Sequence, residues 1–186
     1  MSNPKTSLVL YAIGLFVLGA VVALGGEHLF FKRTDPRDSM RTMEAFQDWQ
    51  LTCSPRTDKN GGCELATAIF DRATRAPLVR LTVNQKGADE TLAVVTPLGV
   101  LIPPGVRLSI GSAQPRLLAF RTCVQGGCVA ILPLDSDLTS EMARNTLGKI
   151  VVVNAAGKAV ALNYSLNGFA DAMAARAVDM AARTGR

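Results

Sequence analysis

Four cysteines are the residues whose type and spacing could support chemistry in this 186-residue chain. Cys53 and Cys63 enclose a polar stretch that ends in Asn60-Gly61-Gly62, and Cys123 and Cys128 enclose a shorter stretch with two glycines. Glycines favour tight turns between strands, so each pair is placed to close a hairpin as a disulfide.

Other cysteine chemistry is also open to this set. Three disulfide connectivities are formally possible, and thiolates can bind zinc or act as a redox pair. Zinc ribbons and thioredoxin-like sites use the short C-x-x-C spacing, which neither pair has. We predict two local disulfides, Cys53–Cys63 and Cys123–Cys128, and such a framework in a small domain indicates an oxidising compartment.

Catalytic groups are scarce in the sequence. His28 is the only histidine and lies beside an N-terminal hydrophobic segment, so a Ser-His-Asp or Cys-His hydrolase has no base in the folded domain. Phosphate-binding loops, G-x-S-x-G and H-E-x-x-H are absent. The acids stand singly or, like Asp89 and Glu90, fall in an expected turn as solvated charges. We therefore predict no enzyme, no metal and no cofactor.

The net charge of +5 comes from 20 basic and 15 acidic residues that are spread along the chain. Nucleic-acid-binding domains gather Lys and Arg in patches with interleaved aromatic residues, and this chain shows neither feature. We expect no nucleic-acid partner. A mildly basic surface is compatible with anionic lipid headgroups or an acidic protein.

An uncharged segment of about twenty residues, Ser7–Gly26, precedes the rest of the chain. As a helix it would reach about 30 Å, the thickness of the hydrocarbon core of a bilayer. Gly14 and Gly19 give it a loose seam of small residues for helix docking, or they face lipid as filler. We predict a transmembrane anchor within residues 1–31, with the lipid bilayer as the partner of residues 7–26. A cleaved signal peptide is the competing interpretation.

The charges that flank this segment conflict with the cysteines on orientation. Lys5 precedes it, whereas a basic cluster that includes Lys32 and Arg33 follows it, and the positive-inside rule places the more basic side in the cytoplasm. Disulfides instead require that the domain after this segment lies outside the cytoplasm. We give the cysteines priority and expect a single-pass protein of a bacterial inner membrane whose C-terminal domain lies in the periplasm.

Past the hydrophobic segment, the pattern indicates a short stalk and then one strand-rich domain, residues 46–186. Asp35-Pro36 favours a short helix in the linker 32–45, because Asp caps helices and Pro suits their first turn. Short β-branched runs then alternate with Gly, Pro, Asn and Asp breaks. The expected strands are Trp49–Cys53, Cys63–Phe70, Leu78–Asn84, Thr91–Thr96, Val106–Ile110, Leu117–Cys123, Cys128–Leu132, Lys149–Val153 and Ala159–Ser165.

Two helices interrupt this strand pattern. The first, Asp137–Leu147, is expected to be capped by Asp137 or Thr139 and stopped by Gly148. The second, Phe169–Arg183, has a stripe at helical spacing that is predicted to pack on a sheet. Its members are Phe169, Met173, Ala177 and Met180. The predicted fold is mainly β, an antiparallel β-sandwich or barrel-like domain with a C-terminal helix, plus one N-terminal transmembrane helix.

One set of segments is spread over about residues 46–178. It consists of Trp49–Cys53, Cys63, Thr96–Val100, Pro103–Val106, Cys123–Cys128 and Ser165–Phe169. In this order and spacing the chain resembles the invasion-associated locus B family of alphaproteobacteria. The resemblance implies a secreted or periplasmic β-sandwich-like domain, associated in some pathogens with entry into host cells and without catalytic residues to carry over.

The family's recurrent positions have structural interpretations in this chain. They are Trp49 as a core plug, Pro97 and Gly99 as a turn, Pro103, Pro104 and Gly105 as a chain reversal, and Gly168 with Phe169 as the entry to a helix. Family members usually carry cleavable leaders, so a retained anchor departs from the pattern.

Two functions are compatible with the sequence. The first is a non-catalytic, membrane-anchored periplasmic interaction module, such as an accessory or structural subunit of an inner-membrane energy-converting complex. Its partner would be an integral inner-membrane protein or complex. The second is a secreted or surface factor that contacts host cells.

Overall fold

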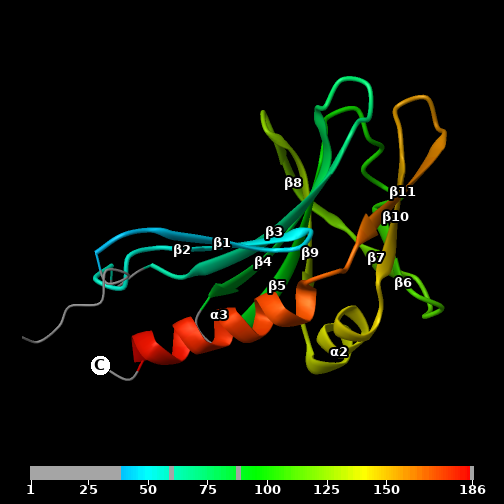
Figure 1. Ribbon diagram of the computed structural model, residues 1–186. Helices are drawn as coiled ribbons and strands as arrows, with labels where there is room; N and C mark the ends of the chain where they lie inside the picture. Colours follow the sequence, from blue (N-terminus) through cyan, green and yellow to red (C-terminus); the bar gives the residue numbers. More distant parts are fainter. Residues whose placement is uncertain (1–38, 59–60, 87–88, 185–186) are drawn as a thin grey trace, which may run out of the picture. The chain divides into compact units, whose positions relative to one another are not determined.

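A computed structural model describes residues 39–58, 61–86 and 89–184, which form the β-domain. Eleven strands and two helices follow one another along this part of the chain (Figure 1). They are β1 (Thr42–Phe46), β2 (Trp49–Cys53), β3 (Cys63–Phe70), β4 (Pro77–Lys86), β5 (Asp89–Thr96), β6 (Val106–Ile110), β7 (Arg116–Leu118), β8 (Phe120–Val124), β9 (Gly127–Pro133), α2 (Ser136–Arg144), β10 (Leu147–Val153), β11 (Ala159–Ser165) and α3 (Phe169–Thr184).

The strands form two antiparallel sheets that share one core. The larger sheet has the order β1-β2-β3-β4-β5-β9-β8, and the smaller has the order β11-β10-β6-β7. Apolar side chains alternate along the strands, so Leu65 and Leu81 of the larger sheet and Leu108 and Ile150 of the smaller one meet in a single buried cluster. The mainly β fold and its C-terminal helix are confirmed. In the described chain neither sheet closes, so the barrel-like alternative is wrong.

Eight of the nine expected strands lie within observed strands, and the ninth is divided. The predicted strand Leu117–Cys123 is divided at Ala119: β7 pairs with β6 in the smaller sheet, whereas β8 pairs with β9 in the larger one. The run contains no Gly, Pro, Asn or Asp to mark a break, which is why the sequence hides the point where the chain changes sheets.

The predicted stalk helix is wrong at its C-terminal end. Thr42–Phe46 is an edge strand, because each of its residues pairs with a residue of β2 from Phe46↔Trp49 to Thr42↔Cys53. Ser39, Met40 and Arg41 are not helical either, and residues 35–38 of the predicted helix lie outside the described residues. The predicted anchor positions Ser7, Gly14, Gly19 and Gly26 also lie outside them. Within the described ranges, neither helix is long and apolar enough to cross a membrane.

The boundaries of α2 also differ from those predicted. The cap is Asp135, whose carboxylate accepts a hydrogen bond from the Leu138 backbone N–H at 2.7 Å. The helix ends at Arg144, because Leu147 already begins β10. Gly148 is therefore a strand residue, and the aromatic ring of its neighbour Tyr164 occupies the space that a Cβ would fill.

The buried face of α3 is rotated relative to the predicted stripe. Phe169 is fully buried, and Met173 and Met180 pack at the edge of the core, but Ala177 is exposed. The most buried positions are Phe169, Ala172, Arg176 and Asp179. Two charged residues thus lie on the buried face of α3, next to the positions that the hydrophobic pattern predicted.

Candidate functional site

Both predicted disulfides are present. Cys53 and Cys63 face each other across β2 and β3, and Cys123 and Cys128 face each other across β8 and β9. All four cysteines are described and none is free. A four-cysteine zinc site is therefore excluded for the oxidised protein, because a disulfide sulfur offers no thiolate.

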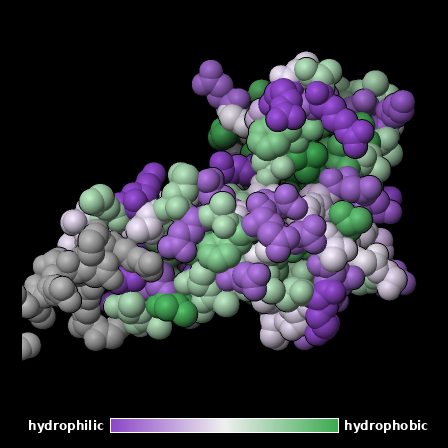
Figure 2. Space-filling view, viewed as in Figure 1, coloured by the Kyte–Doolittle hydropathy of each residue, from purple (hydrophilic) through white to green (hydrophobic). Residues whose placement is uncertain are grey.

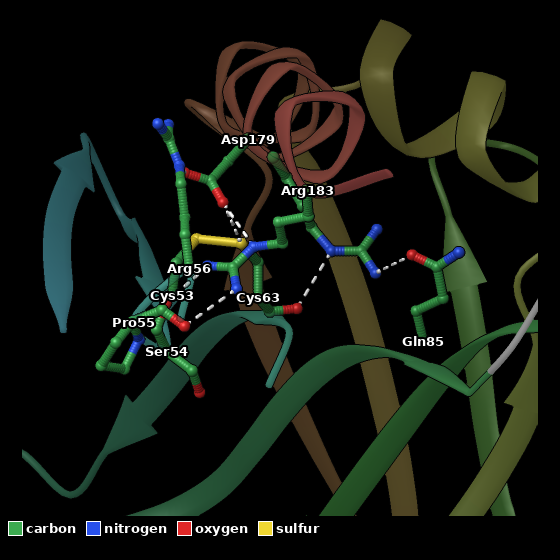
Figure 3. The surroundings of a disulfide bond; sticks show 9 residues. Cys53, Ser54, Pro55, Arg56, Cys63, Gln85, Asp179 and Arg183 are labelled. Atoms are coloured by element: carbon green, nitrogen blue, oxygen red, sulfur yellow. Dashed lines mark hydrogen bonds and ion pairs between the residues drawn. A yellow bond between two sulfur atoms is a disulfide. The ribbon is translucent and has the colours of Figure 1, made fainter. Parts of the chain in front are cut away.

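A cluster of charged side chains covers the Cys53–Cys63 disulfide (Figure 3). The carboxylate of Asp179 on α3 accepts hydrogen bonds from Arg56 at 3.0 Å and from Arg183 at 2.7 Å. Burial raises the pKa of Asp179, but the hydrogen bonds and charges of Arg183 and Arg56 outweigh this effect and hold the pKa below its usual value. Asp179 is therefore ionised and fully engaged at neutral pH.

The same cluster has the size of a metal site but not its chemistry. The Sγ atoms of Cys53 and Cys63 and a carboxylate oxygen of Asp179 lie within 4.8 Å of one another. The sulfurs are bonded to each other, and the carboxylate already has two guanidinium partners. This cluster joins α3 to the loop after β2, where Arg183 also donates to the carbonyl of Ser54.

Arg176 makes the second attachment of α3. Its side chain is 2% exposed, and it donates to the Cys63 carbonyl at 3.2 Å, to the Glu90 carboxylate at 2.5 Å and to the Gln85 side chain at 3.5 Å. Glu90 was expected to be a solvated turn charge, but it lies in β5 and pairs with this arginine. Together, the hydrogen bonds and ion pairs of Arg176 and Asp179 hold α3 against the larger sheet.

An apolar groove lies at the opposite end of the larger sheet from the Cys53–Cys63 disulfide. It has a volume of about 570 Å³, and we call it the loop-end groove. Its lining comes from the ends of β3 and β5, the start of β4 and the β8–β9 turn, and includes Phe70, Pro77, Val95, Pro97, Leu98 and Gly126. Three large apolar side chains stand in or beside it in water: Phe70 is 53% exposed, Leu98 58% and Val124 56%.

Local hydrogen bonds shape the β3–β4 connection beside this groove. The Asp71 carboxylate accepts hydrogen bonds from the backbone N–H and hydroxyl of Thr74 and from the Ala73 N–H. These bonds lower the pKa of Asp71, with the Thr74 backbone bond contributing most. The folded connection sets Phe70 opposite Pro77 in the strand register.

The other two walls of the loop-end groove, at the end of β5 and at the β8–β9 turn, depend on glycines. Gly99 has φ +89°, a conformation that favours glycine, and it completes the bend that Pro97 begins. Gly127 has φ +130°, and a Cβ there would lie 2.2 Å from the Thr96 carbonyl oxygen, so only glycine lets β9 approach β5 at this point. The Cys123–Cys128 disulfide closes the turn between β8 and β9.

The remaining predicted residues serve the core and its turns. Trp49 is 1% exposed, its ring lies 5.0 Å from that of Phe169, and its indole N–H donates to the Ser165 carbonyl at 3.2 Å. Gly168 begins α3 at φ +85°, where a Cβ would lie 2.0 Å from the Phe46 carbonyl oxygen. Trp49 as a core residue and Gly168 as the helix entry are therefore confirmed.

The chain reversal before β6 is also confirmed. Pro103 and Pro104 form a turn in which the Gly105 N–H donates to the Ile102 carbonyl at 3.1 Å. Gly105 has φ +64°, and a Cβ would lie 2.5 Å from the Leu118 carbonyl oxygen. The segments singled out by sequence thus lie at the Trp49–Phe169 contact, the Cys53–Cys63 disulfide, the loop-end groove and the reversal before β6, without gathering at one reactive centre.

Comparison with known proteins gives matches that cover most of the chain. The model of the invasion associated locus B (IalB) protein family matches residues 49–177. Two invasion protein B homologues of Brucella abortus, from strain 2308 and from biovar 1 strain 9-941, are each 24% identical over 164 residues, which is 87% of this chain and 92% of the relative. The crystal structure of invasion associated protein B from Bartonella henselae matches with a TM-score of 0.67 at 19% identity, over 75% of this chain and 98% of that one.

Proposed function

Because the chain belongs to the invasion-associated locus B family, we propose that its β-domain is a non-catalytic interaction module that binds a partner protein through the loop-end groove. The observation that carries this proposal is the gathering of exposed apolar side chains from three connections around one groove. Exposed apolar patches that adjoin a concave surface are typical of protein interaction sites. The turns that carry these side chains are fixed by the Cys123–Cys128 disulfide, by glycines and by the hydrogen bonds to Asp71. Binding therefore loses little conformational entropy, because the turns are already ordered.

The sequence supports a location for this module. We propose that Ser7–Gly26 anchors the protein in the inner membrane and that the β-domain lies in the periplasm, where disulfides persist. The partner is then an integral inner-membrane protein or complex. An accessory subunit of an energy-converting complex fits these requirements, since it needs an anchor and a binding surface but no active site.

Two leucines of equal exposure provide the test. Leu98 in the loop-end groove and Leu147 at the start of β10 are both 58% exposed. After purification in mild detergent, Leu98→Ser is expected to lose co-purifying protein relative to the wild type, and Leu147→Ser is expected to retain it. Equal co-purification with both variants, whether retained or lost, argues against this groove as the binding surface.

The second candidate function is that of a secreted or surface factor that contacts host cells. The family's name and the names of the Brucella relatives favour it. N-terminal sequencing of the mature protein separates the two functions. A chain that starts near Leu24 or Gly25 removes the anchor and supports secretion, whereas a start at Met1 or Ser2 supports the tethered module.

A further inference from the structure

A second groove separates the free edges of two strands, one from each sheet. Its volume is about 680 Å³, and both β3 and β11 line it, through Ala66–Phe70 and Asn163–Ser165. The β1–β2 turn closes one end, because the Thr67 hydroxyl donates to the Asp48 carbonyl at 2.7 Å. We call this groove the seam.

The main-chain groups of β11 point alternately toward β10 and into the seam. The Asn154 N–H donates to the Lys158 carbonyl, and the Leu166 N–H donates to the Thr146 carbonyl, which fixes the hydrogen-bonded pairs of this antiparallel ladder. Even-numbered residues of β11 therefore bond to β10, and Ala159, Ala161 and Asn163 present their N–H and C=O groups to the free edge of β11. Asn163 lines the seam, and Ala161 lies two residues before it on the same edge. Ser165 continues this odd series, and its carbonyl indeed accepts the Trp49 indole N–H.

The facing edge belongs to the second half of β3. Pairing with β2 ends at Gln50↔Ala66, whereas pairing with β4 continues to Phe70. The Ser54 N–H donates to the Gly62 carbonyl, so even-numbered residues of β3 face the β2 side. Ala68 therefore presents its main-chain groups to the seam, opposite those of β11.

Part of the core remains uncovered in and beside the seam. Ile69 on β3, which lines the seam, and Val160 and Leu162 on β11, which precede its lining, pack against the buried cluster but remain half-buried. Unpaired strand edges recruit extended chains, and exposed apolar positions at every second residue require the same alternation in the occupant. Figure 2 shows apolar residues among hydrophilic ones in the upper part of the molecule, where the β3–β4 and β10–β11 hairpins of Figure 1 lie.

We propose that the seam binds an extended segment of a partner protein by strand addition to β11. Apolar side chains at alternate positions of that segment cover Ile69, Val160 and Leu162, and its main chain bonds to Ala161 and Asn163. Ala68 bonds the opposite edge of the same segment. This is a binding mode separate from the loop-end groove, because main-chain hydrogen bonds carry the affinity and do not require Leu98.

The probe is a synthetic seven-residue peptide, Lys-Thr-Val-Thr-Val-Thr-Lys, added to the full chain in detergent. Hydrogen exchange at the amides of Ala161 and Asn163 is expected to slow by about tenfold or more at saturating peptide, since new hydrogen bonds protect these groups. The same peptide methylated at every second amide nitrogen is expected to give no protection. Protection by both peptides, or by neither, overturns the proposal.

Two variants at one position provide the matched control. Ala161→Pro removes an N–H at the free edge of β11 without removing a bond to β10, and Ala161→Thr keeps that N–H. Peptide affinity is expected to fall about tenfold in Ala161→Pro and to stay unchanged in Ala161→Thr. Equal affinity in both overturns strand addition. Slowed exchange that depends on protein concentration without peptide assigns the seam to a second copy of the chain and also overturns the proposal.

Discussion

Trp49 lies on β2 of the larger sheet and contacts both α3 and the smaller sheet. Its ring packs edge-on against Phe169 and its N–H reaches Ser165 of the smaller sheet. Trp49→Ala is therefore expected to lower the free energy of unfolding by about 3 to 5 kcal/mol in chemical denaturation, because it opens a cavity in the core. Trp49→Phe keeps most of the packing and is expected to cost less. A loss below about 1 kcal/mol for the alanine variant, the range of ordinary surface changes, contradicts a core role.

Tyr164 has a buried hydroxyl that the hydrophobic pattern of the sequence does not reveal. Its ring lies on Gly148 and its hydroxyl is buried without a hydrogen-bond partner among the described residues. Burial raises the pKa of this hydroxyl well above its usual range. Tyr164→Phe removes the unsatisfied group and is expected to leave stability unchanged or to raise it by up to about 1 kcal/mol in thermal or chemical unfolding. A loss above about 1 kcal/mol would show that the hydroxyl is bonded in the native protein.

Single residues with special backbone requirements could be predicted well from the sequence. Gly99, Gly105 and Gly168 have positive φ angles that favour glycine, and a Cβ at Gly105 or Gly168 would also collide with a carbonyl oxygen. The buried charges could not be predicted in this way. Arg176 and Asp179 look like solvent-facing positions in a sequence, and only the fold places Cys63, Glu90 and Arg56 beside them.

At the scale of the element, the ion pairs that attach α3 to the loop after β2 predict that the free energy of unfolding depends on pH. Asp179→Asn leaves Arg56 and Arg183 without their carboxylate and is expected to cost about 2 kcal/mol at neutral pH. The pKa of Asp179 is depressed in the folded state, so its contribution is present above the unfolded-state pKa of about 3.9 and is lost as the pH falls through the folded value. The difference in unfolding free energy between wild type and Asp179→Asn is therefore expected to shrink below about pH 4. A difference that stays constant down to pH 2 is incompatible with this ion pair.

Strand positions follow directly from the alternation of apolar and polar residues, as in Cys63–Phe70, whose predicted bounds match β3. Element boundaries that depend on residues distant in the sequence cannot be predicted from this alternation. Thr42–Phe46 is a strand because β2 provides its partner edge, and Asp135 rather than Asp137 caps α2 because Leu138 and Met142 must both be buried. The change of sheet at Ala119 also depends on β6 and β9, which local sequence does not contain.

At the scale of the whole molecule, the segment Ser7–Gly26 is expected to serve partner association as well as membrane retention. Replacing it with a Leu/Ala span of equal length keeps its hydrophobicity and removes Gly14 and Gly19. Co-purification of the partner is expected to fall while the protein stays in the membrane fraction, because helix contacts in lipid depend on close packing. Unchanged co-purification would mean that the β-domain alone carries recognition.

The arrangement of the two sheets was the least predictable part of the fold. Nine expected strands were compatible with a barrel or a sandwich, and only the pairings show that the described sheets stay open at β11 and beyond Ala66 of β3. The loop-end groove is likewise a product of this arrangement. Phe70, Leu98 and Val124 are far apart in sequence and meet because β3, β5 and β8 end on the same side.

Site-specific photo-crosslinking in intact cells tests the interaction module most directly. A photoreactive amino acid is placed at Leu98, in the loop-end groove, and in a separate strain at Leu147, which is equally exposed at the start of β10. We predict one discrete crosslinked protein from position 98 and none from position 147, with the crosslink weakened by Phe70→Ser. The same crosslinks from both positions, or none from position 98, would contradict the assignment of the groove as the binding surface.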